Sequence, residues 1–218
     1  MYFFIKRFFD ILFSLIVLII LSPLLLIVIF VLLLTDEHEV FFFQKRIGFK
    51  NHEFNIWKFA TMMKNSPNIG TGEITLRNDP RVTTAGKYLR ITKINELPQV
   101  INVLLGDMSI VGARPLMKKS FDLYTEEVKS KIYNTRPGIT GIGSVIFRDE
   151  EKLISESKNI QDTYHQIFQY KGELEMWYQK NISFYTDFMI LFLTAWSIVF
   201  PNNQLVQKVF KSLPVRPF

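Results

Sequence analysis

Residues 95–115, NELPQVINVLLGDMSIVGARP, form the stretch around which the rest of the chain is organised. Its apolar residues recur with the period of a helix that buries one face: Leu97, Val100, Ile101, Leu104 and Leu105. Asn95 is a favourable N-cap and Gly106 a favourable helix stop, so the sequence predicts a short helix between them. The free N–H groups and the positive dipole end at the start of that helix favour a bound phosphate.

Basic side chains lie on both sides of this helix. Arg90 precedes Asn95 by five residues and Arg114 follows the helix, and each guanidinium could bind a phosphate through two parallel hydrogen bonds. Lys58 ends a predicted strand, where a lone lysine is usually solvated, so its role depends on other support. The sequence therefore predicts an anion site at the start of the helix.

The amino-acid composition favours some kinds of binding partner and excludes others. The chain has 218 residues with 48% hydrophobic content and 21 Phe, which is high for a soluble protein and indicates lipid contact. The net charge of +6 favours acidic partners such as anionic lipid or phosphate esters. No nucleic acid partner is expected, because base-stacking modules and zinc-finger spacings are missing. The absence of cysteine excludes disulfides, thiolate metal sites and a cysteine nucleophile, and the three histidines are too scattered to favour a metal cluster.

An uncharged run of 24 residues, 11–34, follows Lys6 and Arg7 near the N-terminus. About 20 apolar residues suffice for a transmembrane helix, so a straight span is one interpretation. Pro23, preceded by Ser22, predicts a kink in the middle of the run, because proline removes a backbone hydrogen bond. The Ser22 hydroxyl could satisfy the carbonyl that is freed. Each half would measure roughly 16–18 Å, too short for a hydrocarbon core of about 30 Å, so a bent helix that returns to the same side is the second interpretation.

Asp10 lies at the mouth of this run, where a carboxylate is costly in lipid unless it is paired. Arg7 lies one turn earlier, at the i−3 position, and is the candidate partner. An interfacial charge pair with no further role is one interpretation of these two residues, and a functional role is the other.

The segments that flank the central helix predict a small β-hairpin and loops. Residues 40–44 and 54–59 are β-prone and flank a turn, which is typical of a hairpin. Residues 64–78 are polar and contain Pro and Gly, so a loop is predicted. Residues 136–141 are rich in turns, and their backbone could approach a ligand closely.

The second half of the chain is helical in pattern. Residues 118–133 and 162–181 predict helices, and residues 188–200 are apolar but too short to span a membrane, which favours an interfacial or core helix that ends at Pro201. The tail carries basic residues that suit an anionic membrane surface: Lys208, Lys211 and Arg216.

Many short motifs follow one another in a fixed order along nearly the whole chain. They are Lys6-Arg7 with Asp10, Ser22-Pro23, Phe43-Gln44 with Arg46 and Gly48, Lys58-Phe59 with Thr61-Met62, Asp79-Pro80-Arg81, Gly86, Leu89-Arg90, Glu96-Leu97-Pro98-Gln99, Asn102-Val103-Leu104, Gly106-Asp107-Met108-Ser109, Val111-Gly112, Arg114-Pro115, Arg136-Pro137-Gly138 and Thr140-Gly141. In this order they resemble the bacterial sugar transferases called monotopic phosphoglycosyl transferases, or polyprenyl-phosphate glycosylphosphotransferases.

The resemblance implies an α+β, mostly helical fold. It implies that residues 1–35 form a re-entrant membrane helix broken at Ser22-Pro23, with Arg7 and Asp10 at its entry. It also implies that residues 36–218 form a catalytic domain with a small β-hairpin and amphipathic interfacial helices. The expected location is the cytoplasmic face of the bacterial inner membrane, in contact with anionic phospholipid. The sequence leaves a homodimer open.

The resemblance also implies a reaction. Family members move sugar-1-phosphate from a nucleoside diphosphate-sugar, usually a UDP-sugar, to undecaprenyl phosphate, the first membrane step of a surface glycan such as an exopolysaccharide, capsule or O-antigen. They use an Asp-Glu pair with Mg²⁺: the Asp attacks the phosphate that bears the sugar, and the lipid phosphate then attacks the acyl-phosphate. Carried onto this sequence, the catalytic positions are Asn95 and Glu96, with Glu96 as the Mg²⁺ ligand. The implied phosphate-binding residues are Lys58, Arg81, Arg90, Arg114 and Arg136.

Asn95 is the departure that matters, because the family pattern has Asp at this position. A neutral amide is a poor phosphoryl nucleophile and a weaker metal ligand than a carboxylate. Glu96 could itself be the nucleophile, or the metal ligand or base in a direct transfer between the two substrates. An acid from residues 149–151 could replace the missing carboxylate, the Asp→Asn change could have been introduced, or the protein could bind substrate and do no chemistry. Three more residues differ from the family pattern: Ala60, Ala113 and Ser144. Several changes of this kind favour a divergent branch of the family with a rearranged pocket.

Overall fold

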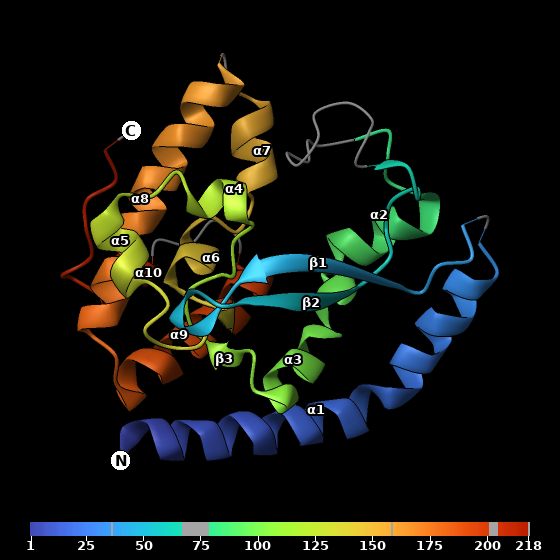
Figure 1. The fold of residues 1–218 in the computed structure, drawn as a ribbon, viewed down its shortest axis with the longest axis horizontal. Coiled ribbons are helices and arrows are strands. Elements are labelled where there is room, and N and C mark those ends of the chain that lie inside the picture. Colours follow the sequence, from blue (N-terminus) through green and yellow to red (C-terminus); the bar gives the residue numbers. More distant parts are fainter. Residues whose placement is uncertain (36, 67–78, 158, 201–204, 218) are drawn as a thin grey trace.

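The structure is a computed structural model that describes residues 1–35, 37–66, 79–157, 159–200 and 205–217 (Figure 1). Its α-helices are α1 (Tyr2–Leu33), α2 (Thr84–Ile91), α3 (Gln99–Leu105), α4 (Lys118–Phe121), α5 (Glu126–Lys131), α6 (Ile142–Ile146), α7 (Glu150–Ser155), α8 (Ile160–Lys180), α9 (Phe184–Val199) and α10 (Leu205–Val209). The strands are β1 (Phe41–Ile47), β2 (Glu53–Phe59), β3 (Ser109–Val111) and β4 (Gly138–Thr140), and two short 3-10 turns are η1 (Phe49–Asn51) and η3 (Ile94–Glu96). The expected α+β, mostly helical class is confirmed. Most of the predicted loop at 64–78, and Pro201, lie outside the described residues.

Helix α1 bends in its middle but is not interrupted, so its second half turns away from the first (Figure 1). Pro23 lies inside the helix, and the carbonyl that it leaves without a backbone donor is that of Ile19. The Ser22 hydroxyl donates to this carbonyl at 2.8 Å, so the predicted kink and its compensation are both observed. Within the described part of the chain, α1 is the one helix whose length and apolar composition would allow it to cross a membrane.

Polar side chains near the start of α1 bind this helix to the rest of the molecule. The Arg7 guanidinium donates to the carbonyls of Val103 at 2.6 Å and Leu104 at 3.1 Å, both in the last turn of α3. Buried Asp10 accepts a hydrogen bond from the backbone N–H of Ile110 at 3.0 Å. Among the described residues no ion pair joins Arg7 to Asp10, so the pairing expected from their i−3 spacing is not formed. Each side chain has a backbone partner in another element instead.

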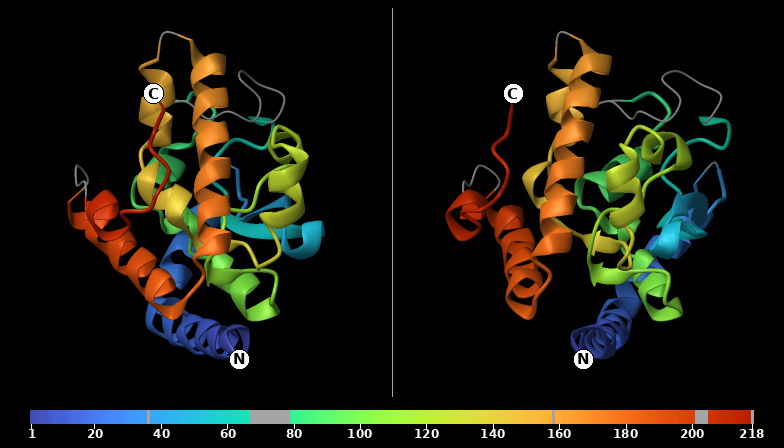
Figure 2. Two further views of the ribbon diagram at one scale, coloured as in Figure 1. Left: turned by 90° about the vertical axis from the view of Figure 1, so that its left-hand side faces the viewer. Right: turned by 60° about the vertical axis from the view of Figure 1, so that its left-hand side comes forward.

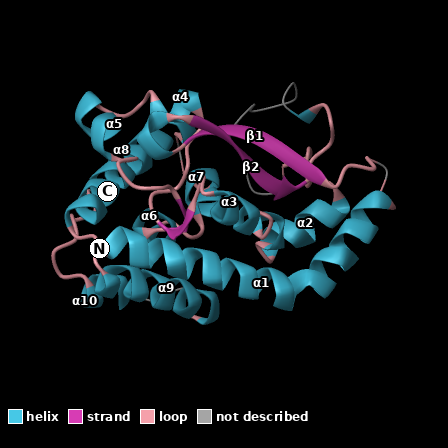
Figure 3. Cartoon of the chain, turned by 60° about the horizontal axis from the view of Figure 1, so that its bottom comes forward, coloured by secondary structure: helices cyan, strands magenta, loops and turns pink. Residues whose placement is uncertain are grey.

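Helix α9 runs beside the first half of α1 (Figure 3). Lys6 forms an ion pair with Asp187 of α9, and the Tyr2 hydroxyl donates to the same carboxylate at 2.6 Å. Both helices expose large apolar side chains, among them Phe4, Phe8, Ile19, Phe30, Phe188 and Val199. The two helices, joined by these polar contacts, therefore both carry exposed apolar side chains.

The predicted hairpin is confirmed. Strands β1 and β2 pair antiparallel, with Phe43 opposite Trp57 and Phe41 opposite Phe59. A second, unpredicted pair is parallel: β3 lies beside β4, with Val111 opposite Thr140. A Cβ on Gly138 would lie 2.1 Å from the backbone N of Gly112. The turn-rich segment 136–141 thus brings its backbone close to another strand of the protein.

The central helix begins later than the sequence indicated. Residues Ile94–Glu96 form a 3-10 turn entered through Lys93, which has a left-handed φ of 60°, and α3 follows Pro98. Because proline has no N–H and a preset φ, it favours the start of an α-helix, and the residues before it close tighter i→i+3 hydrogen bonds. Asn95 is therefore not the N-cap, and that prediction is wrong. Gly106 does end α3, with a φ of 97°.

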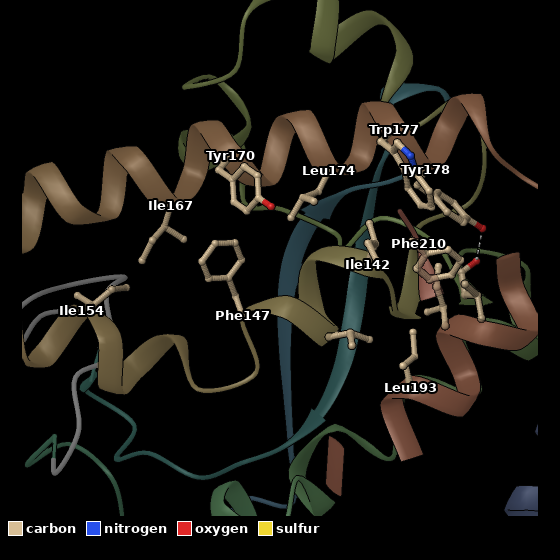
Figure 4. Packing of buried hydrophobic residues seen from close by; sticks show 13 residues of the cluster. Ile142, Phe147, Ile154, Ile167, Tyr170, Leu174, Trp177, Tyr178, Leu193 and Phe210 are labelled. Carbon is tan, nitrogen blue, oxygen red and sulfur yellow. Dashed lines mark hydrogen bonds between the residues drawn. The ribbon is translucent and has the colours of Figure 1, made fainter. Parts of the chain in front are cut away.

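The largest core cluster of the described residues lies along α8, which runs vertically in Figure 2 and carries several of the side chains drawn in Figure 4. Leu174 and Ile167 of α8 are fully buried against Ile142 of α6 and Leu193 of α9. The predicted helix at 162–181 corresponds to α8 and the one at 188–200 to α9. The predicted helix at 118–133 is split into α4 and α5.

Candidate active site

A cleft of about 2140 Å³ opens between the hairpin, α2, η3 and the region of α6 and α7. Six of the seven predicted catalytic and phosphate-binding residues line it: Lys58, Arg81, Arg90, Asn95, Glu96 and Arg114. They come from segments that are far apart in the chain, so the fold gathers them. The residues predicted to form an anion site therefore lie around one cleft.

The Glu96 carboxylate is the centre of this group. Its Oε1 accepts a hydrogen bond from Lys58 Nζ at 3.0 Å and another from Arg114 Nη2 at 2.8 Å. The side chains of Lys58 and Glu96 are 16% and 19% exposed, whereas that of Arg114 is 42% exposed. One carboxylate oxygen thus holds two cations at the wall of the cleft.

The strand alternation of β2 explains how Lys58 reaches Glu96. Side chains two residues apart lie on one face of a strand, so Ile56 and Lys58 share a face. Ile56 is buried against Val103 of α3 and Met108. Lys58 is therefore directed to the same side of the hairpin, toward the segment that contains Glu96.

Tyr133 holds the backbone that carries Arg114. Its hydroxyl donates to the Arg114 carbonyl at 2.8 Å and accepts the N–H of Leu116 at 3.0 Å. The ring is 1% exposed and stacks on Phe121. A buried tyrosine in a helical-looking segment gave no sequence signal for this role.

Charge and burial act in opposite directions on the ionisable groups of the site. Burial would raise the pKa of the Glu96 carboxyl, but the charges and hydrogen bonds of Arg114 and Lys58 outweigh it and hold that pKa well below its usual range. Burial lowers the pKa of Lys58 to about 8 even though Glu96 opposes the change. Glu96 is therefore ionised at neutral pH, while Lys58 loses its proton under mildly alkaline conditions.

Asn95 is 7% exposed and contributes to the cleft wall, yet its Oδ1 is buried without a hydrogen-bond partner in the described structure. An unsatisfied buried acceptor costs about 1–3 kcal/mol. Neither capping nor a local hydrogen bond explains the residue at this position.

Glu96 and Asn95 are the residues that could hold a magnesium ion taking most of its ligands from substrate and water. Mg²⁺ is commonly held by one or two carboxylates together with substrate phosphates. The recorded contacts of Glu96 all use Oε1, and the unpartnered Oδ1 of Asn95 is an oxygen ligand of a suitable kind. In the described part of the chain, no group of three or more His, Cys, Asp or Glu side chains could form a metal site without such help.

Two of the expected phosphate-binding arginines have other partners. The Arg81 guanidinium is buried and forms a two-bond ion pair with Asp79, at 2.9 and 2.6 Å. Arg136 is not among the residues that line the cleft: its Nε donates to the Gly106 carbonyl at 2.7 Å, and its guanidinium lies 5.3 Å from the centre of the Phe49 ring. It therefore lies at the end of α3 that is remote from Glu96.

The cleft also contains an ion pair that the sequence did not indicate. Lys171 of α8 donates to Glu150 of α7 at 2.6 Å, and both residues line the cleft. Glu150 belongs to the acidic segment 149–151, which could supply a second carboxylate. Its charge is engaged by Lys171 in this structure, whereas Asp149 is exposed on the cleft wall.

The fold and this cleft define a class of protein in which a long apolar helix is docked on an α+β domain that presents a cleft lined by basic side chains. Residues 1–201 match the family described as bacterial sugar transferase, so the chain belongs to that family and the resemblance in its motifs is confirmed.

Relatives with curated names have similar sequences. The chain is 36% identical over 201 residues to an Aeromonas hydrophila protein named UDP-N-acetylgalactosamine-undecaprenyl-phosphate N-acetylgalactosaminephosphotransferase, covering 91% of this chain and 44% of that protein. It is 35% identical over 191 residues to the uncharacterized sugar transferase EpsL of Bacillus subtilis, covering 88% and 85%. A Salmonella typhimurium protein named undecaprenyl-phosphate galactose phosphotransferase is 32% identical over 206 residues, covering 88% and 40%. The chain thus spans less than half of the Aeromonas and Salmonella proteins.

Proposed function

We propose that the protein is a phosphoglycosyl transferase that moves sugar-1-phosphate from a nucleoside diphosphate-sugar to undecaprenyl phosphate. The observation that supports it most directly is the contact of Glu96 with both Lys58 and Arg114 in the cleft. The names of the Aeromonas and Salmonella relatives support a polyprenyl phosphate acceptor, and the first of them supports a UDP-sugar donor.

Lys58 and Arg114 would bind the diphosphate of the donor. Both are cations at the cleft wall, and a guanidinium can bind a phosphate through two hydrogen bonds. A Mg²⁺ held by Glu96 and Asn95 would neutralise charge on the diphosphate when it is bound. In the absence of an aspartate at position 95, an oxygen of the lipid phosphate attacks the sugar-bearing phosphorus. The bond to the nucleoside monophosphate breaks, and that group leaves.

The contacts of Glu96 favour direct transfer over attack by Glu96 itself. An oxygen that accepts hydrogen bonds from two cations has reduced basicity, and the pKa of this carboxyl is far below neutral. Such a carboxylate is better suited to hold cations than to remove a proton or form an acyl-phosphate.

The bend in α1 supports a monotopic arrangement on the cytoplasmic face of the inner membrane. The second half of the helix turns away from the first (Figure 1). The uncharged residues before Pro23 (11–22) and the helical residues after it (24–33) each measure roughly 15–18 Å, too short to cross a core of about 30 Å. The exposed apolar side chains of α1 and α9 would lie in the lipid, with the cleft at the level of the head groups.

The test is Mg²⁺-dependent release of nucleoside monophosphate from UDP-sugars by the purified protein in undecaprenyl phosphate micelles. Direct transfer predicts release only when both substrates are present. The variant Glu96→Gln should lose at least about 10³-fold in kcat/KM, because the charge that organises the site is removed. Full activity of Glu96→Gln would disprove this assignment.

Asn95 supports a second candidate function, in which the protein binds polyprenyl phosphate or nucleotide-sugar without turnover. This candidate predicts measurable binding of undecaprenyl phosphate or UDP-sugar, with no monophosphate released across a broad donor panel. Robust turnover by the natural sequence would exclude it.

A further inference from the structure

Asn102 is a fully buried amide whose hydrogen bonds reach two other segments. Its Oδ1 accepts the backbone N–H of Trp57 at 2.9 Å, and its Nδ2 donates to the carbonyl of Asn55 at 2.8 Å. Nδ2 also donates to the Asp107 carboxylate at 3.2 Å. All of these bonds leave α3, although asparagine inside a helix has no intrinsic advantage there.

The two bonds to β2 imitate a neighbouring strand. Residues 55 and 57 are two apart, so their backbone groups point to the same edge of β2, away from β1. A primary amide offers one acceptor and one donor side by side, as a peptide group does. Asn102 therefore pairs with a stretch of the β2 edge that would otherwise have unsatisfied backbone groups.

This pairing fixes the position of β2 along α3. The apolar contacts of Ile56 with Val103 and Met108 hold the two elements together, but such contacts are non-directional. The amide bonds specify one register, and a slip by one residue would move the strand by about 3.3 Å. Lys58 directly follows Trp57, and Glu96 lies six residues before Asn102.

We propose that Asn102 is a positioning residue that sets Lys58 against Glu96. It contacts neither side chain and acts through the backbone of β2. Displacing a catalytic group by about 1 Å can lower the rate about 10²-fold, so a change in the register of β2 should lower activity. A catalytic role for the pair of Lys58 and Glu96 rests on the proposed function, whereas the placement of Lys58 by Asn102 does not.

The test measures the exposure of Lys58 without requiring turnover. The rate at which an amine-reactive acylating reagent labels Lys58 is followed by mass spectrometry at one fixed pH in detergent micelles, with Lys45 as the internal reference. In the natural protein Lys58 should be labelled much more slowly than Lys45, because the Lys58 side chain is 16% exposed and that of Lys45 is 78% exposed. In Asn102→Ala, Lys58 would leave its buried contact with Glu96, and its labelling rate should rise toward that of Lys45.

A graded series and a matched control separate positioning from general stability. Asn102→Asp keeps the size and the acceptor for Trp57 but cannot donate to Asn55, so the labelling rate of Lys58 should lie between those of the other two proteins. Ile190→Ala removes buried volume in a different cluster and should lower the melting temperature while the labelling rate of Lys58 stays near that of the natural protein.

Enzyme kinetics provides a second test of the role of Asn102. If the protein turns over, Asn102→Ala should lower kcat/KM at least about tenfold and Asn102→Asp less, whereas Ile190→Ala should not change it at temperatures where it is folded. Absence of turnover would overturn the proposed function and leave the labelling result standing. An unchanged labelling rate of Lys58 in folded Asn102 variants, or a series in which none folds, would overturn the positioning role.

Discussion

The charge of the cleft should change with pH because Lys58 loses its proton as the pH rises. Burial lowers its pKa to about 8, and its ammonium form is the one that would bind a diphosphate. We expect kcat/KM to fall about tenfold per pH unit above about 8, because the cation is lost. In Lys58→Arg the guanidinium stays charged, so the alkaline fall should move beyond pH 9. A pH profile that is the same in both proteins would show that another group titrates.

Asn95 permits a gain-of-function experiment. The variant Asn95→Asp places a carboxylate beside Glu96, where the family pattern has its nucleophile. We expect monophosphate release from the donor alone, before undecaprenyl phosphate is added, and an added mass of sugar-phosphate on the tryptic peptide that contains residue 95. The natural protein is the control and should show neither. No added mass on Asn95→Asp would mean that the cleft has lost the geometry for covalent catalysis.

The residues expected to form the site lie together in the fold, but the contacts of their side chains did not follow from the sequence. Glu96, Lys58 and Arg114 were identified and are in contact. Arg136 was also identified, but it contacts the far end of α3, because a resemblance gives residue types and not the direction of a side chain. The roles of Asn102 and Tyr133 had no sequence signal, since each depends on backbone groups brought near by the tertiary fold.

Helices and strands could be predicted where their sequence pattern extended over many residues. The β1–β2 hairpin, α8 and α9 follow from strand propensity and apolar periodicity. Strands β3 and β4 contain three residues each and are held by a pairing between distant segments, so local propensity could not reveal them. The start of α3 was misplaced because the preference for proline at the first helical turn outweighed the capping tendency of Asn95.

The bend of α1 is an element-scale feature that a single substitution can test. Pro23→Ala restores a backbone donor to the Ile19 carbonyl, and we expect a straighter helix. A straight helix of 32 residues is about 48 Å long and would cross the membrane. The chain has no cysteine, so single cysteines at positions 4 and 34 can be labelled with an impermeant maleimide in oriented vesicles. Both should react from the same side in the natural background and from opposite sides in Pro23→Ala. Labelling from opposite sides in the natural background would contradict the re-entrant arrangement.

At the scale of the whole molecule, polar anchors connect the apolar helix to the cleft. Arg7 holds the end of α3, and Asn102 in the same helix holds β2, which carries Lys58. Lys6 and Asp187 connect α1 to α9. The position of α1 is therefore mechanically linked to the segments that form the site.

The stability of the whole molecule should depend on pH through Glu175. This carboxyl is 4% exposed in the core around α8, and burial raises its pKa to about 7. Because the folded state holds this proton more tightly than the unfolded chain, whose pKa is about 4.3, the contribution to stability is fully present below about pH 4.3 and is lost as the pH rises through about 7. We expect the free energy of unfolding to fall by about 3 kcal/mol from this group between pH 4.5 and 8, measured by denaturant titration in detergent micelles. In Glu175→Gln, which cannot ionise, this part of the slope should disappear. An equal slope in the two proteins would show that other groups govern the pH dependence of the fold.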